Sequence, residues 1–229
     1  MKKVIYALMI ILTTTVAKAQ ETDFSLGADF VSSYVWRGAY QTSAAVQPGM
    51  AFSVSGFSLS AWGSVPFQGA GKEVDFSVGY EIAGLSLMIT DYWWEGEDVY
   101  KYFTYGNKKT AHHFEATVEY ELPVEKFPLS LSWNTMFAGE DFKGENYKRA
   151  YSTYISASYP FKVKDVDLGV SMGITPWEGM YSDDFSVLHI GLKASKEIKI
   201  TDSFSLPVFG EIIANPKYED VFFVFGISL

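Results

Sequence analysis

Six acidic side chains recur at alternate positions within apolar segments, a pattern from which a sequence could build a charged interior. Asp75 and Glu81 alternate with apolar residues from Val74 to Ile82, and Asp167 does the same just after Val166. Successive side chains of a strand point to opposite faces of a sheet. We therefore expect the acids to share one face, where rings of acids would favour cations. The candidate lumen-lining acids are Asp75, Glu81, Glu115, Glu119, Glu121 and Asp167.

The histidines raise the question of a metal site or a catalytic base. His112 and His113 lie close to Glu115, but neighbouring side chains on a strand face opposite ways and cannot chelate one ion. His189 is alone in its segment, and the sequence brings no serine, histidine and acid together. The absence of cysteine excludes thiol catalysis and Cys-based metal sites. We expect no catalytic residue, no metal and no cofactor.

Arg37 supports two interpretations. Its guanidinium could bind a phosphate or carboxylate through two hydrogen bonds, or it could pair with an interior acid or extend to the membrane interface. The interior acids could likewise be neutralised by Arg149, Lys193 or Lys72 in a filled core. The sequence leaves an open and a filled interior equally possible.

Further acids lie between the apolar segments. Oxygen-rich loops can bind Ca²⁺ or Mg²⁺, but these acids lack the spacing of a calcium-binding loop, and we expect a solvated acidic rim instead. These loop acids are Glu95, Glu97, Asp98, Glu140, Asp141, Glu145, Asp183 and Asp184.

Strands must position all these side chains, because the alternation has a period of two. A helix would mix the polar and apolar sets on one face. About twelve such segments occur, each near the ten or so residues of a tilted membrane strand. We expect them to begin near Asp23, Ala45, Phe57, Lys72, Leu85, Ala111, Pro128, Arg149, Asp165, Asp184, Asp202 and Glu219.

The connections between these segments alternate in length. Short turns and mostly longer loops at opposite ends are typical of outer-membrane barrels. We therefore predict an all-β, transmembrane, antiparallel up-and-down barrel with both ends of the chain on the short-turn side. The loop 95–110, with Tyr100, Tyr102, Phe103 and Tyr105, is the candidate constriction of the lumen. The short connections are 55–56, 83–84, 123–127, 162–164 and 196–201, and the longer ones are 37–44, 66–71, 95–110, 138–148 and 176–183.

Aromatic residues gather near the expected strand ends. Trp and Tyr favour membrane interfaces because the ring is apolar while its N–H or O–H stays hydrated. We predict an aromatic girdle at this level. Its members are Tyr34, Trp36, Tyr92, Trp93, Trp94, Trp133 and Trp177.

Both ends of the sequence indicate export. Residues 1–19 have the basic start, apolar stretch and small-residue cleavage site of a signal peptide, which leaves residues 20–229 as one barrel domain.

Removing the three lysines of residues 1–19 leaves 15 basic and 27 acidic residues, a net charge of -12 that argues against nucleic acid as a partner. The apolar parity from Val221 to Leu229 resembles the terminal strand read by the barrel-assembly machinery, which usually ends in Phe.

Several motifs resemble the TorF family of porin-like proteins. The most distinctive is Val31-Ser32-Ser33-Tyr34-Val35-Trp36-Arg37-Gly38, followed by Gln47-Pro48-Gly49 and Ala61-Trp62-Gly63-Ser64. Asp91-Tyr92-Trp93-Trp94 and the stretch from Ser132 to Gly139 resemble the versions found in Bacteroidota-type bacteria. The resemblance covers most of the chain after residue 19 and implies an exported outer-membrane barrel. It supplies no established substrate or catalytic residues.

These patterns lead to one expected function and two rivals. We expect a narrow channel for passive diffusion of small polar or cationic solutes across the outer membrane of a Gram-negative bacterium. The only other partners we expect are the surrounding lipid and the assembly machinery. A structural or adhesion barrel would instead have a packed interior. An outer-membrane lipid-modifying enzyme would need serine, histidine and an acid converging on one wall.

Overall fold

The computed structural model describes residues 22–95, 101–106, 110–124, 127–144 and 147–229. Their fold is all-β and is built on a closed antiparallel barrel of twelve strands, which confirms the predicted fold class. Within these ranges, no helix has the length and apolar character needed to cross a membrane. The predicted signal peptide, residues 1–19, lies outside the described residues.

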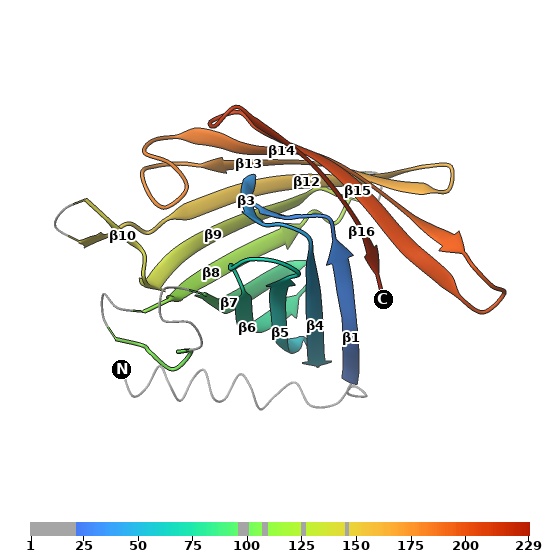
Figure 1. Ribbon diagram of the computed structural model, residues 1–229, viewed down its shortest axis with the longest axis horizontal. Helices are drawn as coiled ribbons and strands as arrows, with labels where there is room; N and C mark the ends of the chain where they lie inside the picture. The colour runs from blue at the N-terminus through green and yellow to red at the C-terminus, as the bar shows by residue number, and fades with distance from the viewer. Residues whose placement is uncertain (1–21, 96–100, 107–109, 125–126, 145–146) are drawn as a thin grey trace.

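The barrel strands follow one another around the wall in chain order, so the topology is up-and-down (Figure 1). The wall closes where β1 pairs with β16, with Phe30 opposite Ile227, and where Ala28 and Leu229 exchange two backbone hydrogen bonds of 3.0 Å. The barrel strands are β1 (Thr22–Val31), β4 (Ala45–Val54), β5 (Phe57–Pro66), β6 (Glu73–Ile82), β7 (Leu85–Trp94), β8 (His112–Glu121), β9 (Ser130–Gly139), β12 (Thr153–Val163), β13 (Val166–Thr175), β14 (Ser186–Lys199), β15 (Ser205–Asn215) and β16 (Asp220–Ser228).

Two small hairpins interrupt this order. β2 (Tyr34–Trp36) pairs with β3 (Ala39–Thr42), and β10 (Phe142–Lys143) pairs with β11 (Lys148–Arg149). The expected strand starts agree with the barrel strands within a few residues, apart from the start near Arg149. That residue belongs to β11, and the barrel strand β12 begins at Thr153.

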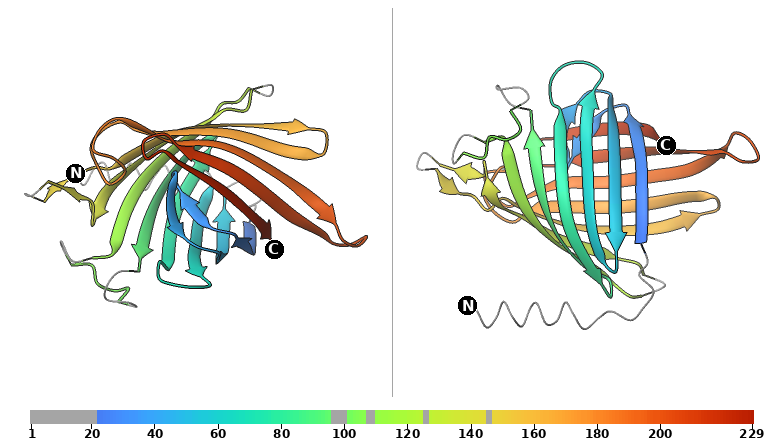
Figure 2. Two further views of the ribbon diagram at one scale, coloured as in Figure 1. Left: turned by 45° about the horizontal axis from the view of Figure 1, so that its top comes forward. Right: turned by 90° about the horizontal axis from the view of Figure 1, so that it is seen from below.

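Connections of two kinds occupy the two ends of the barrel (Figure 2). At one end, here called the turn end, Ser55–Gly56 and Ala83–Gly84 join strands with positive φ at both residues, 51° and 85° in the first turn and 51° and 79° in the second. This conformation matches the twist of an antiparallel hairpin and suits glycine at the second position. The other end, here called the loop end, carries both small hairpins and the long connections 95–111 and 176–185.

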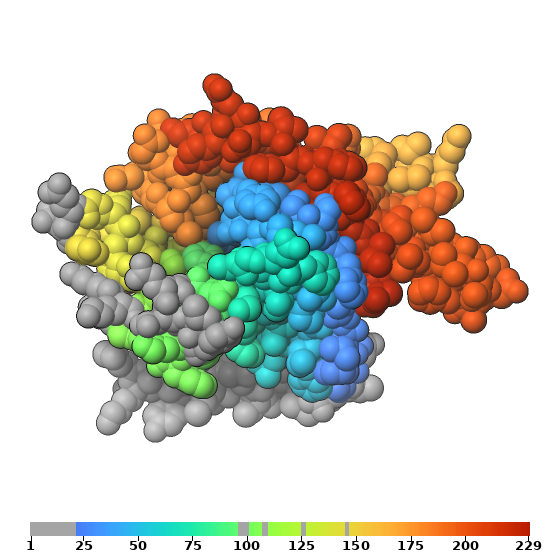
Figure 3. All heavy atoms as spheres, in the orientation of Figure 1, coloured from blue at the N-terminus to red at the C-terminus, as the bar shows by residue number. Residues whose placement is uncertain are grey.

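The two faces of the wall have different chemistry. Val118 and Phe225 are 45% and 58% exposed on the outer face, whereas the neighbouring residues on each strand point inward. A cluster of Tyr154, Tyr181 and Leu188, with Trp36 packed on it, lies in the interior. In the space-filling view, the light-blue atoms of the segment that includes β3 lie between the red atoms above them and the teal atoms below them (Figure 3).

Candidate functional site in the barrel interior

The β2–β3 hairpin folds into the barrel instead of extending away from it. Its turn is Arg37–Gly38, with φ values of 51° and 80°, the two-residue turn that a twisted hairpin requires. A Cβ on Gly38 would collide with the carbonyl oxygen of Leu188 on β14, so only glycine permits this close approach. Asn215 Nδ2 donates a 3.0 Å hydrogen bond to the carbonyl oxygen of Gly38. The hairpin tip is therefore fixed against β14 and β15.

Arg37 connects this tip to the opposite side of the interior. Its Nη1 and Nη2 donate hydrogen bonds of 2.6 and 2.8 Å to the two carboxylate oxygens of Glu115 on β8, and Nη1 also donates to the Tyr181 hydroxyl. The guanidinium lies over the Trp36 and Tyr154 rings, with its Cζ 4.3 and 4.7 Å from their centroids. Of the two interpretations of Arg37, the ion pair with an interior acid is correct.

The aromatic residues around Arg37 correct the predicted girdle. The Trp36 ring lies 5.6 Å from both the Tyr92 and Trp94 rings, and the Tyr34 ring lies 5.5 Å from that of Trp62. Tyr34, Trp36, Tyr92 and Trp94 thus point into the barrel, because the first two belong to the inward hairpin and the others have the inner parity of β7.

The remaining members of the predicted girdle lie on the outer face. The rings of Trp133 and Trp177 are 6.1 Å apart there. Trp93 has the outer parity of β7 and packs against Tyr102, with 5.9 Å between the ring centroids. The girdle prediction is wrong for Tyr34, Trp36, Tyr92 and Trp94, because a position near a strand end does not determine which face of the wall a side chain occupies.

The six predicted interior acids all have inner parity, but they divide into two environments. Asp75 and Glu115 are buried in the loop-end half, whereas Glu81, Glu119 and Glu121 are exposed near the turn end. Asp167 forms an exposed 3.0 Å ion pair with Lys162. A further buried acid, Glu73, escaped prediction although it has the same parity as Asp75.

The three bases suggested as partners contact other groups. Lys72 bonds to Glu95 at 3.2 Å, and Arg149 donates to the Gly139 carbonyl at 2.7 Å. Lys193 lies over the Phe209 ring, 4.7 Å from its centroid. The base that reaches the interior acids is Arg37, which comes from the hairpin.

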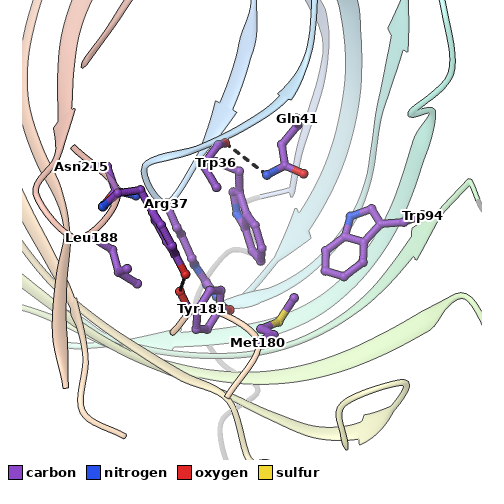
Figure 4. Close-up of a pocket in the computed structure, with 10 residues that line it drawn as sticks. Trp36, Arg37, Gln41, Trp94, Met180, Tyr181, Leu188 and Asn215 are labelled. Carbon is purple, nitrogen blue, oxygen red and sulfur yellow. Dashed lines mark hydrogen bonds between the residues drawn. The ribbon is translucent and has the colours of Figure 1, made fainter. Parts of the chain in front are cut away.

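A cavity of about 360 Å³ lies beside the hairpin at the loop end (Figure 4). Trp36, Arg37 and Gln41 line it from the hairpin, and the labelled side chains of the surrounding wall and loops converge on it. At the turn end, a second hollow of about 350 Å³ is lined by Ser53, Ser58 and Glu81 among others. Hollows therefore lie at both ends of the interior, a mainly apolar one beside the hairpin and a more polar one at the turn end.

The two adjacent histidines face opposite sides of the wall, as the strand geometry predicts. On the outer face, His112 Nδ1 lies 2.6 Å from Asp91 Oδ1, and His112 Nε2 lies 2.5 Å from the Tyr102 carbonyl oxygen. On the inner face, the His113 ring lies 4.2 Å from that of Trp94. The two rings therefore cannot share an ion.

His189 meets a serine and an acid on the inner wall, which the sequence could not reveal because they come from three strands. Ser171 Oγ lies 2.8 Å from His189 Nε2, and Glu211 Oε1 lies 3.9 Å from the same nitrogen. His189 Nδ1 is buried without a hydrogen-bond partner. A catalytic triad places the acid on the nitrogen opposite the serine, so this cluster lacks that arrangement.

The described part of the loop 95–110 lies on the outer wall and does not constrict the lumen. The Tyr102 ring is 6.0 Å from the outward Phe76 ring, and the Tyr105 ring is 6.5 Å from that of Phe114. Phe103 is exposed next to Tyr102, whereas Tyr100 lies outside the described residues. The candidate constriction is therefore wrong, and the β2–β3 hairpin occupies the interior instead.

The loop acids within the described chain make local contacts. Asp141 accepts hydrogen bonds from the Ser152 backbone and hydroxyl. Hydrogen bonds from Lys217 lower the pKa values of Asp183 and Asp184. No group of three or more metal-ligating side chains occurs among the described residues. Glu97, Asp98 and Glu145 lie outside them.

No protein-family model matches this chain, and a comparison with curated proteins also gives no match. The functional argument therefore rests on the barrel and its interior.

Proposed function

We propose that the protein is an outer-membrane channel for small polar solutes, with a preference for cations, and that the β2–β3 hairpin narrows its path. The observation that carries this proposal is the closed wall of twelve strands with an apolar outer face and an acidic interior. Only structures that satisfy all backbone hydrogen bonds internally can span lipid, and a closed barrel does so without a free edge.

The two ends of the barrel support an orientation. Outer-membrane barrels have short turns on the periplasmic side and long loops outside. We therefore assign the turn end to the periplasm and the loop end, with the hairpin, to the outside. The resemblance to the TorF family implies the same location, and β16 is the strand we expect the assembly machinery to recognise.

The interior supports a narrow, charged path. Exposed Glu81, Glu119 and Glu121 line the turn-end half on the side of β6 and β8, where acids would attract cations and repel anions. In the loop-end half, Trp36, Arg37 and their partners leave a cavity of about 360 Å³ beside the hairpin. We expect a small conductance because the hairpin leaves only this limited space in the loop-end half.

A structural barrel is the second candidate, and the buried Arg37–Glu115 pair favours it because the contact packs the interior. A lipid-modifying enzyme is disfavoured because the cluster of Ser171, His189 and Glu211 has the inner parity, away from lipid, and lacks the geometry of a triad. We propose no catalytic role.

The experiment is the conductance of the purified protein in planar bilayers under a potassium chloride gradient. A channel with acidic walls should give small steps with a reversal potential toward that of potassium. A well-folded protein that never conducts would favour the structural barrel, and an anion-selective reversal potential would contradict the role of the acids.

A further inference from the structure

Two acids of β6 are buried side by side in the interior without a countercharge. Glu73 and Asp75 are only 3% and 7% exposed. One carboxylate oxygen of each, Glu73 Oε1 and Asp75 Oδ1, is buried without a hydrogen-bond partner. Both side chains have the inner parity of β6, where Trp94 is opposite Glu73 and Tyr92 is opposite Asp75.

The contrast with Glu115 makes this pair unusual. Glu115 is also buried, but it has the guanidinium of Arg37 at 2.6 Å. Lys72 is adjacent to Glu73 in the sequence, but it has the opposite parity and bonds to Glu95. Desolvating a carboxylate costs several kcal/mol in a protein unless an opposite charge or a proton compensates. The pair therefore needs a cation that the described part of the chain does not supply, or a shared proton.

The surroundings favour a particular class of cation. Tyr34 and Trp94 lie beside Glu73, and Trp62 is opposite Asp75 in the sheet register. Aromatic neighbours supply few oxygen ligands, whereas Ca²⁺ needs about six to eight of them and Mg²⁺ an octahedral set. Two carboxylates and one hydroxyl fall short of both requirements.

From this arrangement we propose that Glu73 and Asp75, enclosed by Tyr34, Trp62 and Trp94, bind a weakly hydrated monovalent cation such as potassium or ammonium. The site lies where the hairpin meets the wall, because Tyr34 belongs to β2. The role of this site in permeation rests on the proposed function. The inference adds to that function the class of solute that the interior selects. Binding itself requires no conduction and is measured separately.

Binding is tested with purified protein in detergent micelles, in a background of N-methylglucamine nitrate, whose cation is too large for the site and whose anion keeps thallous ion in solution. Potassium, ammonium and thallous ions are added separately while tryptophan fluorescence is recorded. Thallous ion quenches tryptophan on contact, and Trp62 and Trp94 border the site. We expect a saturable change with each ion. The half-saturating concentration should rise at least tenfold in the Glu73→Gln, Asp75→Asn double variant.

Asp202→Asn is the matched control, because it removes a fully exposed acid of the turn end that pairs with Lys199 and should leave the titration unchanged. The double variant should fold at least as well as the natural chain, since it removes uncompensated charge, and heat-modifiable migration in SDS verifies this. Identical titrations in the double variant and the natural chain would overturn the site. A fluorescence change that follows pH but no cation would also overturn it, in favour of a shared proton. Saturable binding by a protein that does not conduct would uphold the site while refuting the channel.

Discussion

Replacing Glu115 with glutamine should release the β2–β3 hairpin from the interior. The substitution keeps the shape of the side chain but removes the charge that accepts both hydrogen bonds from Arg37. The side chains of the pair are 9% and 0% exposed, so water cannot replace the lost partner while the hairpin stays docked. Removing one member of such a buried pair costs about 3–5 kcal/mol. At about 1.4 kcal/mol per factor of ten, the docked hairpin loses roughly two to three powers of ten in population.

The barrel itself should survive, because this penalty falls on the docked hairpin and not on the strand pairing of the wall. Leu188 reports on the hairpin, since it is 2% exposed and Trp36 packs on its cluster. The chain has no cysteine, so a Leu188→Cys variant carries one thiol for labelling. Glu115→Gln should speed reaction with a membrane-impermeant thiol reagent by about tenfold or more, as expected if a few kcal/mol of docking free energy is lost.

Two further variants serve as controls for this experiment. Glu119→Gln in the Leu188→Cys background should leave the labelling rate unchanged. Adding Arg37→Met to Glu115→Gln should slow labelling again, because replacing both members of a buried pair by neutral groups is often nearly neutral for stability. Equal labelling of Leu188→Cys with and without Glu115→Gln would refute the idea that the ion pair holds the hairpin.

Three other predictions concern the wall, the orientation and the loops. Val118→Arg should destabilise the protein by roughly 2–4 kcal/mol near the membrane midplane, whereas the neighbouring Glu119→Gln should change the free energy of unfolding little; equal losses in denaturant titrations would contradict the assigned faces. A tag inserted at Gly106 should be reached by antibody on intact cells, and a tag at Ala83–Gly84 should not; reversed labelling would invert the orientation. Because Lys217 lowers the pKa values of Asp183 and Asp184, their contact stabilises the loop 176–185 at neutral pH and is lost as the pH falls through those lowered values, below about pH 4; protease cleavage of this loop that accelerates already near pH 6 would contradict the assignment.

The wall was predictable from the sequence because each barrel strand carries its own signal. The alternation from Val74 to Ile82 determines both the strand and its outward face, and turns such as Ala83–Gly84 mark its end. The inward position of Asp75 and Glu115 follows from the same parity. These properties depend on neighbours in the sequence, so one sequence is enough to infer them.

The filling of the interior was not predictable in the same way. The Arg37–Gly38 turn is a recognisable hairpin signal, but the sequence pattern assigns Tyr34 and Trp36 to a girdle near the strand ends and 37–44 to a loop. The inward direction of the hairpin depends on Glu115, Tyr181 and Asn215, which are distant in the sequence and carry no pattern that links them to Arg37. The outward position of Tyr102 likewise depends on contacts with Phe76 and Trp93.

The most direct test of a channel narrowed by the hairpin compares single-channel conductance in planar bilayers before and after the hairpin is removed. Residues 34–42 are replaced by a short glycine–serine connection, and closure of the barrel is verified by heat-modifiable migration in SDS. The account predicts small, cation-selective steps from the natural chain and severalfold larger steps from the shortened variant. Absence of conductance from both proteins, with the barrel intact, would contradict it.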